Sequence, residues 1–172
     1  MEIIETIYKQ HQSEENILDT YTTTQATYAI MPARHMDYAS IVVEEQATYC
    51  IRERPLQIIK NSCKNDWTTF KGRKTAIAKK LGYAYKTPMI LNQAEQIYAF
   101  PTMSAGKFEC SWIFLKHHLM ILKEGQKGAV VFNNRHKISL DISFHTLREQ
   151  LERTQILAYT IEQERKYQQN KI

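Results

Sequence analysis

The feature that most constrains the fold is a series of short apolar segments that begins near residue 27 and recurs along most of the chain. Residues 26–32, 39–45 and 47–53 are rich in β-branched and aromatic side chains. They are broken by Pro32 and by a polar turn near residues 35–37. Such segments, bounded by turn-forming residues, are typical of β-strands. We therefore expect the N-terminal half of the fold to begin with strands.

The same pattern continues in the second half of the chain. Four further strand-like segments cover residues 88–91, 96–100, 110–115 and 117–122. Two more segments, 128–132 and 137–142, flank the turn-prone sequence Asn133-Asn134-Arg135, and this arrangement predicts a β-hairpin.

Helical patterns separate these strands or follow them. Pro55 suits a first helical position and predicts a short helix ending near Asn61, although a strand is also compatible with residues 55–61. After Gly72 the sequence favours a helix that stops at Gly82, with an apolar side formed by Phe70, Ile77 and Leu81.

A longer helix is predicted at the C-terminus. Thr146 and Glu149 have capping-box spacing. An apolar stripe follows at intervals of three and four residues, and it either packs on the protein's own sheet or pairs with a second subunit: Phe144, Leu147, Leu151, Thr154, Ala158 and Ile161. The predicted fold class is therefore α+β, a single domain with a largely antiparallel β-sheet core, a short basic helix and a long C-terminal amphipathic helix.

Length and composition agree with one domain. The chain has 172 residues, of which 43% are hydrophobic, enough for one buried core. We expect residues 1–24, which are acidic and then Thr-rich, to be a mobile or short helical lead-in, and residues 25–172 to form the domain. No apolar run approaches the roughly 20 residues of a membrane span, and the first residues lack a secretion signal, so we expect a cytoplasmic protein without membrane contact.

The residues that could carry catalysis or bind a metal are sparse. The three cysteines, Cys50, Cys63 and Cys110, have no CxxC spacing and are expected to be reduced and buried. His117 and His118 are adjacent, and adjacent residues of a strand point to opposite faces, which disfavours a shared zinc ion. Nucleotide-binding glycine loops are absent from the sequence. We expect no catalytic residues, no metal and no cofactor.

The charge of the chain is concentrated in one stretch. Residues 52–86 hold ten Lys or Arg against two acids, Glu53 and Asp66, whereas the whole chain has a net charge of +5. Such a concentration favours a polyanionic partner. Within the stretch lies the sequence KGRK, where Gly72 permits close backbone approach and Arg73 is the type of side chain that a narrow A·T-rich minor groove attracts.

Other interpretations of this basic stretch remain open. Lys and Arg often form a solvated face, although here the acids are segregated toward residues 1–24 and the basic stretch is interleaved with aromatic side chains. A general nucleic-acid module that binds RNA is one alternative. A regulatory subunit that binds a partner protein through the C-terminal helix, with charge serving solubility, is another. We expect both tryptophans, Trp67 and Trp112, to lie in the core, with a role as stacking platforms for a nucleic acid as the alternative.

With these segments placed, the sequence resembles the ComK family of competence transcription factors from Gram-positive bacteria. The resemblance runs from about residue 28 to residue 154 and rests on strings in the same order and spacing: PLQIIKNSCK, GRK, PMIL before QIYAFPTMS, CSWI, VVFNNRHKISLDIS and SFHTLREQLERT.

The resemblance implies a DNA-binding transcriptional activator of competence (DNA-uptake) genes that is not an enzyme. Members of the family recognise paired A·T-rich boxes mainly through the minor groove, bend the DNA, and assemble from homodimers into a dimer of dimers on DNA. It further implies nucleoid association when bound and control by an adaptor of a Clp protease. Family members carry an additional C-terminal stretch beyond the helix that this sequence ends with, so adaptor control and full activation are less firmly implied here.

Carried onto this sequence, the resemblance makes the GRK residues the best DNA contacts. Arg73 is expected to insert into the groove, and Lys74 to bind a phosphate. Further phosphate contacts are expected from Lys64, Lys71, Lys79 and Lys80. Thr102 and Ser104, in the FPTMS loop, are weaker candidates for hydrogen bonds to phosphate, and loop capping is an alternative role for both.

Overall fold

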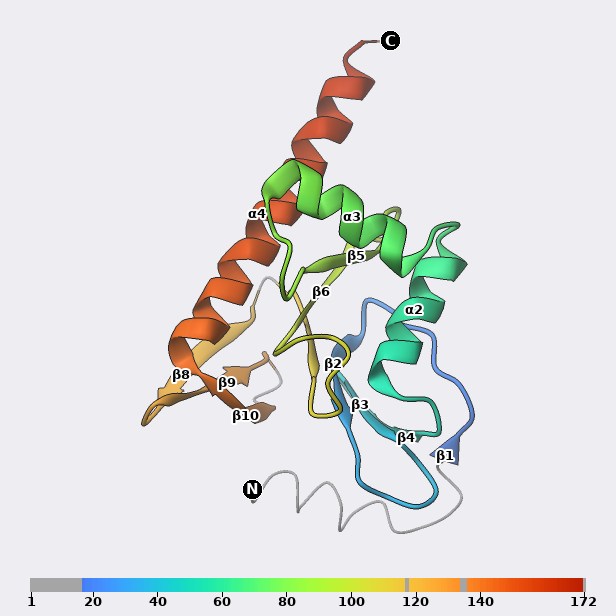
Figure 1. Ribbon diagram of the computed structural model, residues 1–172, viewed down its shortest axis with the longest axis vertical. Helices are drawn as coiled ribbons and strands as arrows, with labels where there is room; N and C mark the ends of the chain where they lie inside the picture. Colours follow the sequence, from blue (N-terminus) through green and yellow to red (C-terminus); the bar gives the residue numbers. More distant parts are fainter. Residues whose placement is uncertain (1–16, 117, 134–135, 172) are drawn as a thin grey trace.

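The structure is a computed structural model that describes residues 17–116, 118–133 and 136–171 (Figure 1). Its larger sheet has seven strands in the order β1-β4-β3-β2-β7-β6-β5. All neighbouring pairs are antiparallel except β1 with β4. The strands are β1 (Ile17–Leu18), β2 (Thr27–Pro32), β3 (Ser40–Glu44), β4 (Thr48–Ile51), β5 (Met89–Asn92), β6 (Ile97–Pro101) and β7 (Trp112–Phe114).

A smaller antiparallel sheet of three strands has the order β10-β9-β8. It contains β8 (Met120–Glu124), β9 (Lys127–Val131) and β10 (Lys137–Ser143). The pairing of β9 with β10 confirms the predicted hairpin, although Asn134 and Arg135 of its turn lie outside the described residues. The prediction of a mostly antiparallel α+β domain is confirmed.

Three helices complete the fold: α2 (Pro55–Asn65), α3 (Phe70–Leu81) and α4 (Phe144–Gln169). Residues 55–61 form a helix and not a strand, with Pro55 at the first helical position. The helix continues one turn past Asn61, where it was expected to end. Helix α3 begins after Thr69, whose hydroxyl accepts from the Gly72 N–H at 3.0 Å. It ends at Gly82, as predicted, because this glycine adopts the left-handed φ of 74°.

The start of α4 differs from the prediction. The N-cap is Ser143, whose hydroxyl accepts from the Thr146 N–H at 3.1 Å, so Thr146 is not the cap that its spacing to Glu149 suggested. Ser143 is an equally suitable N-cap residue although it lacks the Glu or Gln three residues later that makes a capping box, and only the backbone shows where the strand ends and the helix begins. The helix lies close to β9, where a Cβ on Gly128 would approach the Leu147 side chain to 2.6 Å.

The core is divided between the two faces of the larger sheet. Ile30, Val42 and Trp112 belong to a cluster that also includes buried residues of α2, α3 and α4. The opposite face carries Ala29, Met31 and Ile113, which pack with buried residues of the smaller sheet and the first turns of α4. Neighbouring residues of a strand point to opposite faces, so β2 is buried on both sides.

The predicted stripe of α4 packs on its own sheets. Leu147 and Thr154 of the predicted stripe are buried within this protomer, as is Leu157 beside it, so the stripe serves intramolecular packing. Beyond Ile161 every described residue is exposed, and the end of the helix projects from the body (Figure 1). Among the helices that the structure describes, none has the length and apolar character to cross a bilayer.

Part of the expected acidic lead-in lies on the domain. Ile17 and Leu18 pair with β4, and the buried Thr23 hydroxyl lies 2.9 Å from the Ser62 hydroxyl of α2. These contacts attach residues 17–24 to the sheet and to α2, whereas residues 1–16 lie outside the described residues.

Candidate nucleic-acid interface

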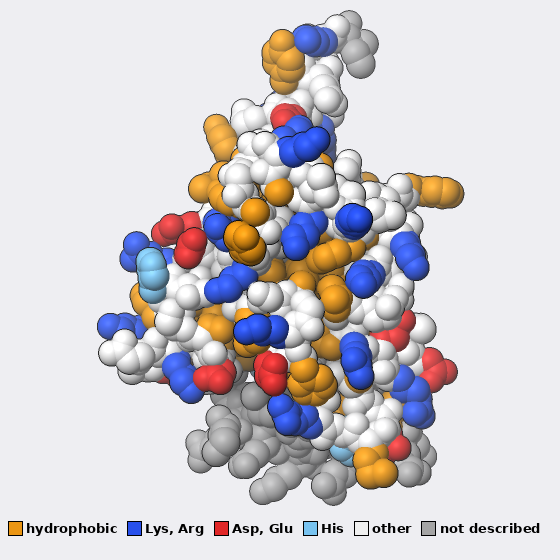
Figure 2. Space-filling view, in the orientation of Figure 1, with side chains coloured by type: hydrophobic (Ala, Val, Ile, Leu, Met, Phe, Trp, Pro, Cys, Tyr) orange, Lys and Arg blue, Asp and Glu red, His pale blue; other side chains and the backbone are white. Residues whose placement is uncertain are grey.

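The basic stretch of the sequence folds into two helices, α2 and α3, joined by residues 66–69. Both helices lie over the same face of the larger sheet, and both contact β5 (Figure 1). Together they contain seven Lys or Arg and no acidic residue. Figure 2 shows Lys and Arg side chains distributed over this face. The α2–α3 unit, residues 55–81, is therefore a strongly basic surface.

Of the predicted contact residues, Lys80 is exposed but paired, and four others are exposed in this unit: Lys64, Lys71, Lys74 and Lys79. Within the described part of the chain, none of the four forms an ion pair. Lys64 lies in the last turn of α2, and Lys71 lies in the first turn of α3, on either side of the connection. The structure thus brings together four uncompensated positive charges.

The positions of two of these lysines are unfavourable for the helix itself. The N-terminal end of a helix carries a partial positive charge, which acidic side chains normally offset. Helix α3 has no acid in its first turn and carries Lys71 and Lys74 near this end. Each misplaced surface charge costs roughly 0.3–1 kcal/mol at low salt. A phosphate bound at this end would reverse that cost and accept hydrogen bonds from free backbone N–H groups.

Lys80 differs from the other lysines. Its ammonium lies 2.7 Å from a carboxylate oxygen of Glu164 in α4. This intramolecular pair partly satisfies the charge, so Lys80 has less to gain from a phosphate than Lys79, which precedes it. Sequence reasoning grouped the two lysines, and only the packing of α3 beside α4 separates them.

Arg73 does not lie where a groove contact requires. Its side chain is only 7% exposed, and its guanidinium donates to the Asp66 carboxylate and to the Ile90 carbonyl oxygen. Arg73 follows Phe70 by three residues and precedes Ile77 by four, so it lies on the inward side of α3. The expected groove contact is therefore corrected to an internal ion pair that ties α3 to the α2–α3 connection and to β5.

The two candidate residues in the FPTMS loop differ in their exposure to solvent. Thr102 is buried, and its hydroxyl accepts from the Ser111 N–H at 3.0 Å, which is the loop-capping role and leaves no exposed hydroxyl for phosphate. Ser104 is exposed, and its carbonyl accepts from the Lys107 N–H at 2.9 Å. Only Ser104 of this pair remains available to a ligand.

Trp67 is the residue whose position sequence reasoning missed. It lies in the α2–α3 connection and is 98% exposed, whereas Trp112 is fully buried as expected. Trp67 was wrongly placed in the core because aromatic residues usually bury their large surface. A signal was present in the turn-forming neighbours Asp66, Thr68 and Thr69, which break the helical periodicity around it.

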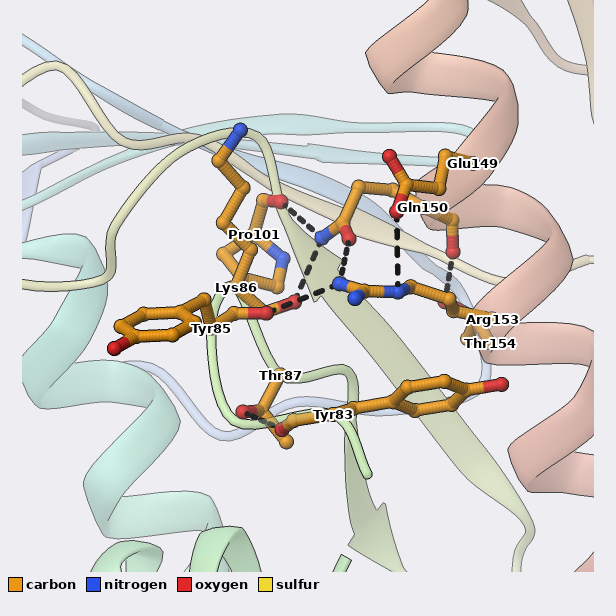
Figure 3. A network of polar contacts seen from close by, with 9 residues as sticks. All are labelled: Tyr83, Tyr85, Lys86, Thr87, Pro101, Glu149, Gln150, Arg153 and Thr154. Atoms are coloured by element: carbon orange, nitrogen blue, oxygen red, sulfur yellow. Dashed lines mark hydrogen bonds and ion pairs between the residues drawn. The ribbon is translucent and has the colours of Figure 1, made fainter. Parts of the chain in front are cut away.

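The loop after α3 is fixed to α4 by a polar network (Figure 3). The buried Gln150 amide donates to the carbonyl oxygens of Lys86 and Pro101, both at 2.8 Å. Arg153 donates to the Tyr85 carbonyl at 3.0 Å, and its guanidinium lies 4.8 Å from the centre of the Tyr83 ring. The C-terminal end of α3 is thereby held on a rigid support.

The structure offers little for catalysis or metal binding. Among the described residues, no three His, Cys, Asp or Glu side chains are close enough to share a metal ion. His117 lies outside those residues. All three cysteines are free and buried, as predicted. Burial raises the pKa of Cys63 and Cys110, which keeps them protonated and poorly nucleophilic.

Comparison with known proteins identifies the family. The ComK protein family matches residues 18–166, which is most of the chain. The chain belongs to the ComK family. The match extends over all described helices and strands from β2 to β10 and over most of α4. Every candidate contact residue of the α2–α3 unit therefore lies inside the ComK region.

A curated relative supports the ComK assignment. The competence transcription factor of Bacillus subtilis (strain 168) is 29% identical over 148 residues, which cover 83% of this chain and 76% of the relative. No solved structure matches the chain. The ComK resemblance noted from short sequence strings is thus confirmed over residues 18–166.

Proposed function

We propose that this protein is a transcriptional activator of competence genes that binds A·T-rich duplex DNA through the α2–α3 unit. The observation that carries the proposal is the set of four exposed lysines of the α2–α3 unit that form no ion pair with the residues that the structure describes. Membership of the ComK family and similarity to a competence transcription factor supply the biological context.

Phosphate contacts come from the exposed lysines. Lys71 and Lys74 bind phosphates at the start of α3, where the helix dipole and backbone N–H groups add to the attraction. Lys64 and Lys79 extend the contact on both sides, and Ser104 is a secondary candidate. Gly72 is exposed between Lys71 and Arg73, and a Cβ there would meet only the Thr69 hydroxyl. That Cβ would lie 3.0 Å from the hydroxyl that caps α3, so a side chain at position 72 would crowd the cap, whereas glycine leaves the backbone open to close approach of a ligand.

The finer features of the proposal follow the family. We propose recognition of paired A·T-rich boxes mainly through the minor groove, bending of the DNA, and assembly of homodimers into a dimer of dimers. The protein would then be nucleoid-associated when bound, and a Clp protease adaptor would be a further partner. Because Arg73 is internal, the groove contact has to come from another side chain of the same unit.

The test is fluorescence anisotropy with two duplexes of equal length, one carrying paired A-run and T-run boxes and one rich in G·C. Neutralising four phosphates per subunit predicts a slope of about −3.6 in log Kobs against log salt for each subunit bound. Distamycin, which occupies the A·T minor groove, should compete with the protein. Tight and distamycin-sensitive binding to the A·T duplex is the expected result.

Other outcomes would select the alternatives. Equal, steeply salt-dependent binding to both duplexes would reduce the protein to a general polyanion binder. Preference for double-stranded RNA would favour the RNA-binding alternative, because A-form helices present a shallow minor groove lined with 2′-hydroxyls. Absence of binding at low salt would leave a regulatory subunit whose basic surface serves solubility.

A further inference from the structure

We infer that Trp67 is a base-contacting residue, whose indole stacks against unstacked bases of duplex DNA while the neighbouring lysines hold the phosphates. The inference rests on the proposed DNA-binding function and adds to it the side chain that reaches the bases. Because Arg73 is internal, Trp67 replaces it as the residue proposed to enter the groove.

The first observation is the exposure of the indole. Trp67 is 98% exposed, although tryptophan is among the residues that gain most from burial. Among the described aromatic ring contacts and cation–π contacts, none involves Trp67. Its aromatic faces are therefore free to contact a ligand.

The second observation is that the backbone beneath the indole is fixed. The Trp67 N–H donates to the Lys64 carbonyl at 3.0 Å, and the Thr68 N–H donates to the Cys63 carbonyl at 3.0 Å. Asp66, directly before Trp67, accepts from the Arg73 guanidinium and from the Gln93 N–H at 3.1 Å. A side chain presented from such a turn loses little backbone freedom on binding.

The third observation is the backbone conformation of Trp67. Its φ of 56° lies in the left-handed region, at the position after a helix end that Gly or Asn normally occupies. A bulky aromatic residue is a poor choice for the stability of this turn. Residues held in such conformations concentrate at functional sites, where the side chain serves binding rather than folding.

The surroundings of Trp67 indicate which ligand it contacts. Lys64 precedes it in α2 and Lys71 follows it in α3, both exposed and both without an acidic partner among the described residues. Phosphates on both sides and an aromatic plane between them match a nucleic acid whose bases are accessible. Apolar side chains that enter the minor groove separate base steps in this way, most easily at flexible A·T-rich steps.

The test uses the full chain and the A·T duplex, with 2-aminopurine replacing one adenine of a box. In the wild type, the exposed Trp67 emission should be quenched by the duplex and shielded from acrylamide, whereas the buried Trp112 emission should not change. The fluorescence of 2-aminopurine should increase because its stacking is disturbed. Loss of one stacked base corresponds to an increase in Kd of about 5- to 150-fold.

Three variants make the test specific. Trp67→Asn suits the left-handed backbone and should retain the wild-type Tm while raising Kd by the stated factor and leaving the salt slope unchanged. Trp67→Phe retains a stacking ring and should bind with an intermediate Kd. Tyr159→Ala is the matched control, because Tyr159 is an exposed aromatic residue of α4 outside the α2–α3 unit and should bind as the wild type does.

Unchanged Kd in Trp67→Asn, or wild-type binding without indole quenching or a 2-aminopurine signal, would overturn the inference while leaving the proposed function intact. A loss of affinity accompanied by a shallower salt slope would also overturn it, since the variant would then have lost phosphate contacts. A wild-type protein that binds no duplex would refute the proposed function, and the Trp67 contact with it.

Discussion

Replacing Arg73 with alanine tests whether the GRK sequence contributes to the fold or to the DNA contact. The Arg73 side chain is 7% exposed and that of its partner Asp66 is 20% exposed. The guanidinium also donates to the Ile90 carbonyl of β5, and Arg73 Nε has no partner among the described residues. We expect Arg73→Ala to lower the free energy of unfolding, and not to remove a direct contact with DNA.

The magnitude follows from what the substitution leaves behind. Removing one partner of a fully buried ion pair costs about 3–5 kcal/mol, mostly from the charge left uncompensated. Asp66 keeps the hydrogen bond from the Gln93 N–H at 3.1 Å and some solvent access, which reduces that cost. The Ile90 carbonyl loses its donor, which adds to it. We therefore expect a loss of about 3 kcal/mol, equivalent to a decrease in Tm of about 6–12 °C for a domain of this size.

The assay is urea and thermal unfolding of the wild type, Arg73→Ala, Asp66→Asn and the double variant. Since the two side chains interact directly, the double-mutant cycle should show a coupling energy of about 1–3 kcal/mol. An unchanged Tm in Arg73→Ala, together with lost discrimination between A·T and G·C duplexes, would refute the internal role. That result would restore the groove contact expected from the sequence.

Three further predictions concern the supporting residues. Lys79→Ala should make the salt slope of duplex binding shallower by about one unit. Lys80→Ala should change this slope less, because Lys80 already pairs with Glu164. Equal changes of the slope in the two variants would contradict this distinction. Gly72→Ala should leave Tm nearly unchanged, since the better helix propensity of alanine is offset by the crowding of its Cβ 3.0 Å from the capping Thr69 hydroxyl. It should weaken duplex binding several-fold, and unchanged anisotropy titrations would show that no close approach occurs there. Gln150→Leu should lower the free energy of unfolding by about 2–4 kcal/mol in urea titrations, because two carbonyl groups lose their donor, and a loss below 1 kcal/mol would mean that water replaces the amide.

The elements that could be predicted from the sequence are those with a strong local signal. The strands of β-branched and aromatic residues, the stop of α3 at Gly82 and the β9–β10 hairpin all follow from short-range preferences. The C-terminal helix was also predicted, but its cap was misplaced. Only Thr146 has a Glu three residues later, yet Ser143 is the N-cap, because the position of the cap depends on where β10 ends.

The basic surface illustrates both the use and the limit of sequence reasoning. The charge excess of residues 52–86 is a property of composition, and it correctly indicated where a basic surface forms. Composition does not tell which of the charges reach the solvent. The i, i+4 spacing of Arg73 to Ile77 turns one arginine inward, and the nearby Glu164 of α4 engages one lysine.

The sequence by itself therefore determined the fold class, the family and the segment that carries the positive charge, because these depend on residue types and their order. Only the tertiary structure decided that Arg73 is internal, that Thr102 is a loop cap and that Trp67 is exposed. The physical reason is that exposure depends on contacts between residues distant in sequence. The Arg73 guanidinium donates to the Ile90 carbonyl of β5, and the Thr102 hydroxyl accepts from the N–H of Ser111, just before β7. The connection between α2 and α3 leaves the indole of Trp67 98% exposed.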